Sequence, residues 1–159
     1  MNFTIRNANK SDMPHVLNLI KELAIFEKEP DAVEVTLSDL EQDGFGENPA
    51  FHCFVAEANG KIEGMALVYY RYSTWKGKAL HLEDLIVSKD MRGSGIGSKL
   101  LDEVVKYGHH LGVKRINWEV LDWNEPAITF YAKKGAHIKS DWRVVHLDEQ
   151  GIKNYISRL

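Results

Sequence analysis

Leu80-His-Leu-Glu-Asp-Leu-Ile-Val87 runs through Ser88-Lys-Asp-Met91 into Arg92-Gly-Ser-Gly-Ile-Gly97, and this stretch decides the fold. The apolar run predicts a strand, and the glycine-rich turn opens a helix expected over 98–111. Glycines at alternate positions leave backbone N–H groups uncovered by side chains, at the positive end of a helix dipole. The stretch therefore predicts a binding site for a phosphate or pyrophosphate group.

The spacing of the glycines excludes two common phosphate loops. A Walker A loop needs Gly-Lys-Ser/Thr, but here Lys99 follows Ser98. A dinucleotide-binding G-x-G-x-x-G would need glycine where Ser98 stands. What is left is Arg-x-x-Gly-x-Gly after a strand, or alternatively a flexible turn without a ligand. The strand before it and the amphipathic helix after it favour the ligand site.

Composition and charge narrow the class of protein. The chain has 159 residues, of which 44% are hydrophobic and 27% charged, as expected for one globular domain over 1–159. The net charge of −3 argues against a nucleic-acid partner. Cys53 is the only cysteine, which excludes an internal disulfide and favours a reducing compartment. The lack of a long apolar run and of a signal sequence predicts a cytoplasmic protein without a membrane partner.

Hydrophobic periodicity predicts the remaining elements. Asn59-Gly60 joins two expected strands as a hairpin, while Ser11-Asp-Met-Pro14 and Thr36 are typical helix starts. Their order indicates a mostly antiparallel sheet with helices on its faces, an α+β or mixed α/β architecture. The expected strands cover 3–5, 51–57, 64–72, 80–87, 115–121 and 142–147, and the expected helices 11–26, 36–44, 98–111 and 126–135, with a final turn from 148.

The glycine loop resembles the acyl-CoA pyrophosphate loop of the GCN5-related N-acetyltransferases (GNAT), and other segments strengthen the likeness. From Ile5 to about Leu147 the chain resembles their diamine (spermidine/spermine) acetyltransferase subgroup. The matching segments are His52-Cys53, Val55-Ala-Glu57, Leu82-Glu-Asp84, Arg92-Gly93, Gly95-Ile-Gly-Ser98, Trp123-Asn124, Phe130-Tyr131 and Gly135-Ala136. The thialysine branch of that subgroup is matched most closely, at Glu22-Leu-Ala24, Phe26-Glu-Lys28, Tyr72-Ser-Thr-Trp-Lys-Gly77 and Val120-Leu-Asp-Trp-Asn124.

The resemblance implies a fold, a donor and a partner. The fold would be a twisted, mostly antiparallel sheet of about six or seven strands with helices on both faces. Acetyl-CoA would be the acetyl donor, no metal would be needed, and the protein would be a homodimer. The loop and neighbouring segments would hold the donor, with the backbone N–H of Leu85 polarising the acetyl carbonyl. The implied donor-binding residues are Leu85, Ile86, Val87, Arg92, Gly93, Ser94, Gly95, Ile96, Gly97, Ser98, Asn124, Pro126, Ala127 and Tyr131.

Acetyl transfer to an amine requires a base, because a primary amine with a pKa of ~10.4 is protonated at neutral pH. Glu83 lies in an apolar strand, where burial would raise the pKa of its carboxyl group; alternatively it is an exposed side chain. The resemblance makes Glu83 a base that acts through ordered water. Strand alternation puts Asp84 on the opposite face unless a bulge re-aims one of them, and family members carry a bulge here.

Tyr131 is the expected general acid, because the resemblance gives this position the role of protonating the departing CoA thiolate. The alternative is a core aromatic residue beside Phe130. Arg92 could bond the pyrophosphate or could form only an exposed salt bridge.

The acceptor site is expected where acidic and aromatic side chains gather, because both favour a cationic alkyl amine. Glu119 departs from the family, which has an apolar residue there, and 136–141 is shorter than its counterpart. The expected acceptor-binding residues are Phe26, Glu27, Trp75, Glu83, Asp84, Asn117, Trp118, Glu119 and Trp142.

These observations predict an acetyl-CoA-dependent N-acetyltransferase that works by direct attack in a ternary complex. The first expected acceptor is thialysine or a lysine-like amine, and the second is a polyamine such as spermidine. A protein-lysine acetyltransferase and a non-catalytic acyl-CoA sensor are the alternatives.

Overall fold

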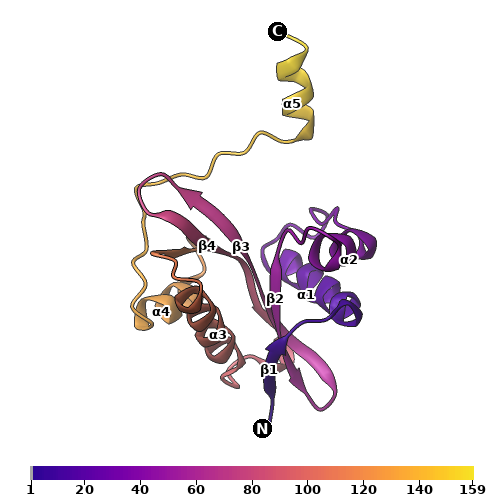
Figure 1. The fold of residues 1–159 in the computed structure, drawn as a ribbon, viewed down its shortest axis with the longest axis vertical. Helices are drawn as coiled ribbons and strands as arrows, with labels where there is room; N and C mark the ends of the chain where they lie inside the picture. Colours follow the sequence, from indigo (N-terminus) through magenta and orange to yellow (C-terminus); the bar gives the residue numbers. More distant parts are fainter. Residues whose placement is uncertain (1) are drawn as a thin grey trace. The chain divides into compact units, whose positions relative to one another are not determined.

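The computed structural model describes residues 2–159, which form two compact units. The first unit ends at Glu119 and the second covers Val120–Leu159. In the first unit the elements are β1 (Thr4–Asn7), α1 (Met13–Phe26), α2 (Leu37–Phe45), β2 (His52–Ala58), β3 (Lys61–Ser73), β4 (Gly77–Val87), α3 (Ile96–His110) and β5 (Ile116–Asn117) (Figure 1). The second unit holds α4 (Glu125–Lys133) and α5 (Glu149–Ile156).

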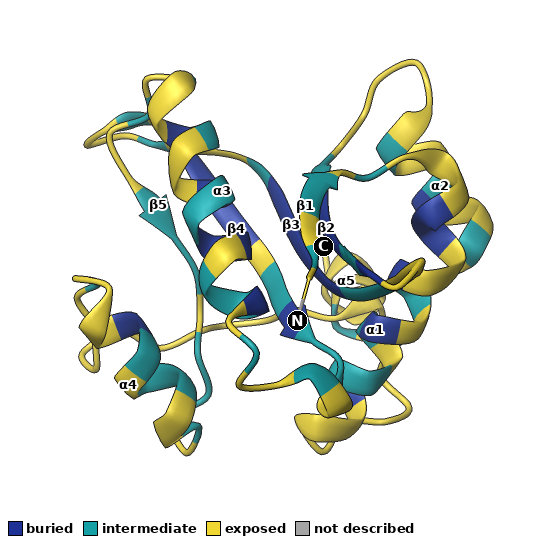
Figure 2. Ribbon diagram, turned by 90° about the horizontal axis from the view of Figure 1, so that it is seen from below, coloured by how far each residue is buried: buried dark blue, intermediate teal, exposed yellow. Residues whose placement is uncertain are grey.

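The first unit is built on one sheet with the strand order β1-β2-β3-β4-β5. All neighbours are antiparallel except β4 and β5, which are parallel. Helices α1 and α2 lie on one side of the sheet and α3 on the other (Figures 1 and 2). This arrangement confirms the predicted α+β class.

Two adjacent residues of β3 show how the sheet separates its two cores. Met65 is fully buried in the cluster that α1 and α2 form with the sheet. A Cβ atom on the preceding Gly64 would meet Ile96 and Leu100 of α3 at 3.1 Å. Since successive side chains of a strand point to opposite faces, α3 covers the face opposite to Met65.

The helix boundaries follow the capping signals of the sequence closely. Thr36 caps α2 by accepting a hydrogen bond from the backbone N–H of Asp39, and the helix runs past the expected stop to Phe45. Helix α1 begins at Met13, with Asp12 as its N-cap in place of Ser11. Helix α3 begins at Ile96, before the expected 98, because Gly95 with φ of 90° turns the chain into the helix. No helix among residues 2–159 has the length and apolar character needed to cross a membrane.

The expectation of six or seven strands is wrong for the described residues, which form five. The predicted strand 115–121 is reduced to Ile116–Asn117, and 142–147 forms no strand. A strand needs a neighbour for its backbone groups, and 142–147 has none within residues 2–159. Its apolar side chains accordingly stay open to solvent, with Val144 58% and Val145 88% exposed.

Candidate active site

The candidate site includes an edge of β4 that is partly without a neighbouring strand. Strand β5 pairs with β4 only at Leu80 and His81. From Leu82 to Val87, no strand in the described part of the chain pairs with the edge of β4 that faces away from β3. Free backbone N–H and C=O groups on such an edge can bind an extended ligand as an added strand. The predicted donor-binding residues Leu85, Ile86 and Val87 lie on this edge.

The glycine loop joins this edge to α3 in a form suited to an anion. Gly93 and Gly95 have φ of 77° and 90°, a conformation that strains other L-residues, and open space lies where their Cβ atoms would be. Ile96, Gly97 and Ser98 form the first turn of α3, whose N–H groups have no acceptor within the helix. These donors and the positive end of the helix dipole fit a pyrophosphate.

Arg92 is held by the protein itself. Its Nε–H donates to the backbone oxygen of Val87 at 3.2 Å, and its Nη2 lies 3.4 Å from the Glu22 carboxylate. The guanidinium group also lies over the ring of Phe26, 5.1 Å from its centroid. The salt bridge considered as an alternative is therefore present, and Phe26, expected at the acceptor site, contacts the arginine of the loop.

A β-bulge in β4 sets the directions of the two central carboxylates. Leu67 of β3 pairs with Asp84 while the next residue, Val68, pairs with Leu82, so Glu83 has no counterpart in β3. Leu67 belongs to the core cluster on the side of α1, and its partner Asp84 faces that side too. The bulge that the resemblance implied is thus present.

The bulge brings Glu83 to the same side as Asp84. The Tyr69 hydroxyl donates to Oε2 of Glu83 at 2.8 Å, and Nε2 of His81 lies 3.4 Å from the same oxygen. Tyr69 packs against the core cluster on the α1 side and is the register partner of His81. Simple alternation, which would place Glu83 and Asp84 on opposite faces, is therefore wrong for this strand.

Asp84 shares a hollow of ≈190 Å³ with the end of α1. Burial, together with the negative charges of Glu83 and Glu27, raises the pKa of the Asp84 carboxyl group to about 6. Burial also raises the pKa of Glu27. The hollow is lined by Ile20, Leu23, Ala24, Glu27, Glu29, Ala32, Val33 and Asp84. An apolar wall with carboxylates suits an alkyl chain that carries a positive charge.

The pKa of Glu83 moves opposite to expectation. Hydrogen bonding from His81 and Tyr69 lowers this pKa by more than partial burial raises it. The expected rise is thus wrong for Glu83, and Asp84 is the carboxyl group whose pKa rises. His81 and Tyr69 were not among the predicted site residues. The position of His81, two residues before Glu83 in one strand, was the available signal.

The other acceptor-site residues of the first unit differ in their surroundings. Asn117 lies beside His81, with 2.6 Å between its side-chain nitrogen and Nδ1. The negative charge of Glu119 contributes to the raised pKa of Tyr69, the residue that donates a hydrogen bond to Glu83. Trp118 is half-buried. Trp75, in the turn between β3 and β4, is 81% exposed and is not brought to the hollow.

The second unit carries the remaining predicted residues. Asn124 caps α4 by accepting from the backbone N–H of Ala127 at 3.3 Å, and Pro126 lies in the first turn as predicted. Tyr131 is 8% exposed, and burial raises the pKa of its phenol to about 12. The phenol therefore stays protonated at neutral pH, as a proton donor must. Trp142 is 70% exposed.

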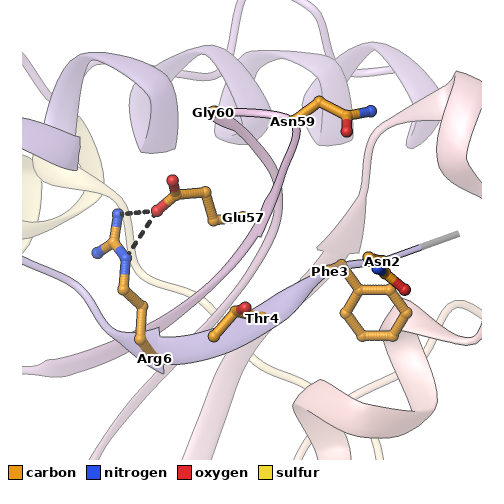
Figure 3. A pocket seen from close by; sticks show the side chains of 7 residues that line it. All are labelled: Asn2, Phe3, Thr4, Arg6, Glu57, Asn59 and Gly60. Carbon is orange, nitrogen blue, oxygen red and sulfur yellow. Dashed lines mark hydrogen bonds and ion pairs between the residues drawn. The ribbon is translucent and has the colours of Figure 1, made fainter.

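A second hollow, at the start of β1, offers no comparable chemistry (Figure 3). Arg6, a cation in its lining, is bound to Glu57 at 2.9 Å and to Asp12 at 2.7 Å. These partners join β1, β2 and the turn before α1, which is a structural role. The hollow is lined by Asn2, Phe3, Thr4, Arg6, Glu57, Asn59 and Gly60.

The chain is similar in sequence to known acetyltransferases. The chain is 42% identical over 140 residues to thialysine N-epsilon-acetyltransferase of Sus scrofa, covering 83% of this chain and 82% of that one. It is 40% identical over 141 residues to spermidine/spermine N(1)-acetyltransferase-like protein 1 of Homo sapiens, covering 84% of this chain and 20% of that one.

Solved structures share the fold at lower identity. An integron cassette protein from the mobile metagenome of V. cholerae gives a TM-score of 0.80 at 21% identity, with 98% of both chains covered. An aminoglycoside acetyltransferase from an uncultured soil metagenomic sample gives 0.76 at 19% identity, with 92% of this chain and 97% of that one covered. The sequence profile of the Acetyltransferase (GNAT) family matches residues 15–136. The chain therefore belongs to the GNAT acetyltransferase family and is an N-acetyltransferase.

Proposed function

We propose that this protein transfers the acetyl group of acetyl-CoA to the primary amine of a small cationic acceptor, first thialysine or a lysine-like amine. The observation that carries the proposal is the hollow between α1 and β4, where Asp84 and Glu27 stand in an apolar wall. The identity of 42% to a thialysine N-epsilon-acetyltransferase supports the same acceptor class. The reaction proceeds by direct attack of the amine in a ternary complex.

The donor binds along the open edge of β4 and the glycine loop. Leu85, Ile86 and Val87 offer backbone groups to the pantetheine arm, and the N–H of Leu85 polarises the acetyl carbonyl. The loop 93–98 binds the pyrophosphate through backbone N–H groups, with Arg92 adding positive charge. Asn124, Pro126 and Ala127 of the second unit are further proposed donor-binding residues.

The acceptor binds as an ammonium ion and must lose protons to react. Asp84 and Glu27 attract the cation into the hollow, and Glu119 adds a further negative charge nearby. Glu83, kept ionised by Tyr69 and His81, accepts the proton of the ammonium through a water molecule.

The transfer itself exchanges one bond for another. The amine nitrogen forms a bond to the acetyl carbon while the carbon–sulfur bond of the thioester breaks. Bond formation leaves the nitrogen positively charged, and it then loses its second proton to water. Tyr131, which is protonated at neutral pH, gives its proton to the departing thiolate, and the phenol is later reprotonated from solvent. A serine, cysteine or other acyl-enzyme nucleophile is not needed.

A polyamine is the second candidate acceptor. The relative named spermidine/spermine N(1)-acetyltransferase-like protein 1 is 40% identical to this chain. We also propose a homodimer, because the second unit leaves several large apolar side chains exposed in one chain. They are Val144, Val145, Leu147, Ile152, Tyr155 and Ile156.

A panel of amines tests the proposed function. Acetyl-CoA is mixed with thialysine, spermidine, 1,3-diaminopropane or a lysine-containing peptide, and release of free thiol is followed. We expect the highest kcat/KM for thialysine, a lower value for spermidine and the lowest for the peptide. A preference for the peptide would indicate a protein-lysine acetyltransferase. A rise in Tm with CoA but no thiol release from any amine would indicate a sensor.

Replacing Tyr131 by Phe tests the proton donor. Because the substitution removes only the hydroxyl group, we expect kcat to fall by roughly 10–1000-fold. CoA should raise the Tm of the variant as it does that of the wild type. Tyr72→Phe, at a tyrosine of β3 that is 73% exposed, is the matched control and should keep full activity. Unchanged turnover in Tyr131→Phe would remove this residue from the proposed role.

Replacing Asp84 by Asn tests the environment of the raised carboxyl group. Its pKa rises from 3.8 to about 6 on folding, so the native state binds more protons in that window and stability falls as pH rises through it. At pH 8 we expect Asp84→Asn to unfold with a free energy higher by about 2 kcal/mol, and to bind the amine more weakly.

At pH 4 the stability difference should nearly vanish, because the native carboxyl group is then mostly protonated. Urea unfolding at both pH values measures the effect, with the exposed Asp43→Asn as a control that should give equal small changes. A destabilised Asp84→Asn protein at pH 8 would contradict the assignment.

A further inference from the structure

His81 is a buried imidazole whose surroundings are those of a functional group. It is 7% exposed, and Asp12 is the other buried charged or strongly polar residue of the described chain. Asp12 is explained by its ion pair with Arg6. His81 instead reaches the carboxylate of Glu83, which is half-exposed. A buried polar group that reaches toward an exposed carboxylate suggests a role in directing it.

Three contacts fix the His81 ring in one orientation. Nδ1 lies 2.6 Å from the side-chain nitrogen of Asn117, and the ring centroid lies 5.1 Å from that of Tyr69. Nε2 lies 3.4 Å from Oε2 of Glu83. With the Asn117 amide donating to Nδ1, the hydrogen of a neutral ring is on Nε2, where it is directed at Glu83.

Both partners of Glu83 contact the same oxygen. The Tyr69 hydroxyl donates to Oε2 at 2.8 Å, and His81 Nε2 approaches that oxygen too. The carboxylate is thus held by Oε2, and neither contact involves its other oxygen, Oε1. A carboxylate that is held in this way is oriented before the substrate arrives, which is how positioned groups lower a barrier.

We propose that His81 is a positioning residue for Glu83: Asn117 orients its ring, and Nε2–H holds Oε2 so that Oε1 is presented to the acceptor amine. The proposal rests on the proposed function and adds a residue to it. Asn117 supports this view, since its buried Oδ1 has no hydrogen-bond partner within residues 2–159. A buried amide oxygen without a hydrogen bond costs stability. This cost is consistent with a role for the amide nitrogen of Asn117 in orienting His81.

The charges around Glu83 come from several elements. Tyr69 and Arg71 belong to β3, and His81 and Asp84 to β4. Glu27 follows α1 and acts through Asp84, and Glu119 follows β5 and acts through Tyr69. Among the groups that contact the Glu83 carboxylate, His81 and Tyr69 are the donors. The hydrogen bond from His81 is the largest cause of the lowered pKa of Glu83. Loss of His81 should therefore raise this pKa.

Three substitutions of His81 separate a positioning role from a structural one. His81→Gln keeps an N–H donor near the place of Nε2, His81→Asn keeps a polar group only near the place of Nδ1, and His81→Phe keeps the ring alone. We measure kcat, both KM values and the pH dependence of kcat/KM with the best amine of the panel. Thermal unfolding reports whether each variant folds.

For His81→Phe and His81→Asn we expect kcat to fall about 10-fold or more, with KM for acetyl-CoA unchanged. The acidic limb of their pH profiles should move to higher pH, because the base is protonated more easily. His81→Gln should recover most of kcat and the wild-type limb. If His81→Phe does not fold, the comparison of Gln with Asn decides the question.

Unmoved acidic limbs in all three variants, or a Gln variant no better than the Asn variant, would overturn the positioning role. Failure of the proposed function looks different: the wild-type protein would then release no thiol with any amine.

Discussion

The β-bulge at Glu83 is the feature on which the candidate site depends. Without it, the pairing of Leu67 with Asp84 and of Val68 with Leu82 could not both exist. The extra residue turns Glu83 toward Tyr69 and His81 while Asp84 faces the end of α1. Pairing of β5 with β4 also stops just before the bulge, at His81. A single inserted residue thus aims two carboxylates and adjoins the edge proposed to bind the donor.

The two neighbouring carboxylates differ because their surroundings differ. Glu83 receives hydrogen bonds, which favour its charged form, and the pKa of its carboxyl group falls. Asp84 is more deeply buried beside other negative charges, and the pKa of its carboxyl group rises to about 6. Adjacent acids whose environments push their pKa values apart are a recurring arrangement in active sites. In this protein Glu83 is held ionised by its hydrogen bonds, and Asp84 lies in the hollow proposed to receive the cation.

Turn and capping residues in the sequence correctly predicted several turns and helix starts, which depend on residues close together in the chain. The glycine loop, the Thr36 cap, the Asn59-Gly60 hairpin and the start of α4 all follow from the conformations and hydrogen bonds of neighbouring residues. The strand expected at 142–147 did not form. Alternation of apolar and polar residues predicts which side chains of a strand would be buried, but it does not show that a partner strand is available.

The site was predicted in its residue types more than in its contacts. Glu83, Asp84 and Glu27 were identified, but the bulge at Glu83 depends on the register between β3 and β4, which composition does not reveal. Tyr69 and His81 lie far apart in sequence and meet across that register. The sign of the pKa shift at Glu83 follows from them, and for that reason it could not be inferred from an apolar strand alone.

The division of roles between Glu83 and Asp84 is tested most directly by a carbon-13 NMR titration of their side-chain carboxyl groups in the free protein. The predicted result is an Asp84 carboxyl group that titrates near pH 6 and a Glu83 carboxyl group that titrates below its ordinary value of 4.5. The reverse order, with Glu83 titrating above Asp84, would contradict it.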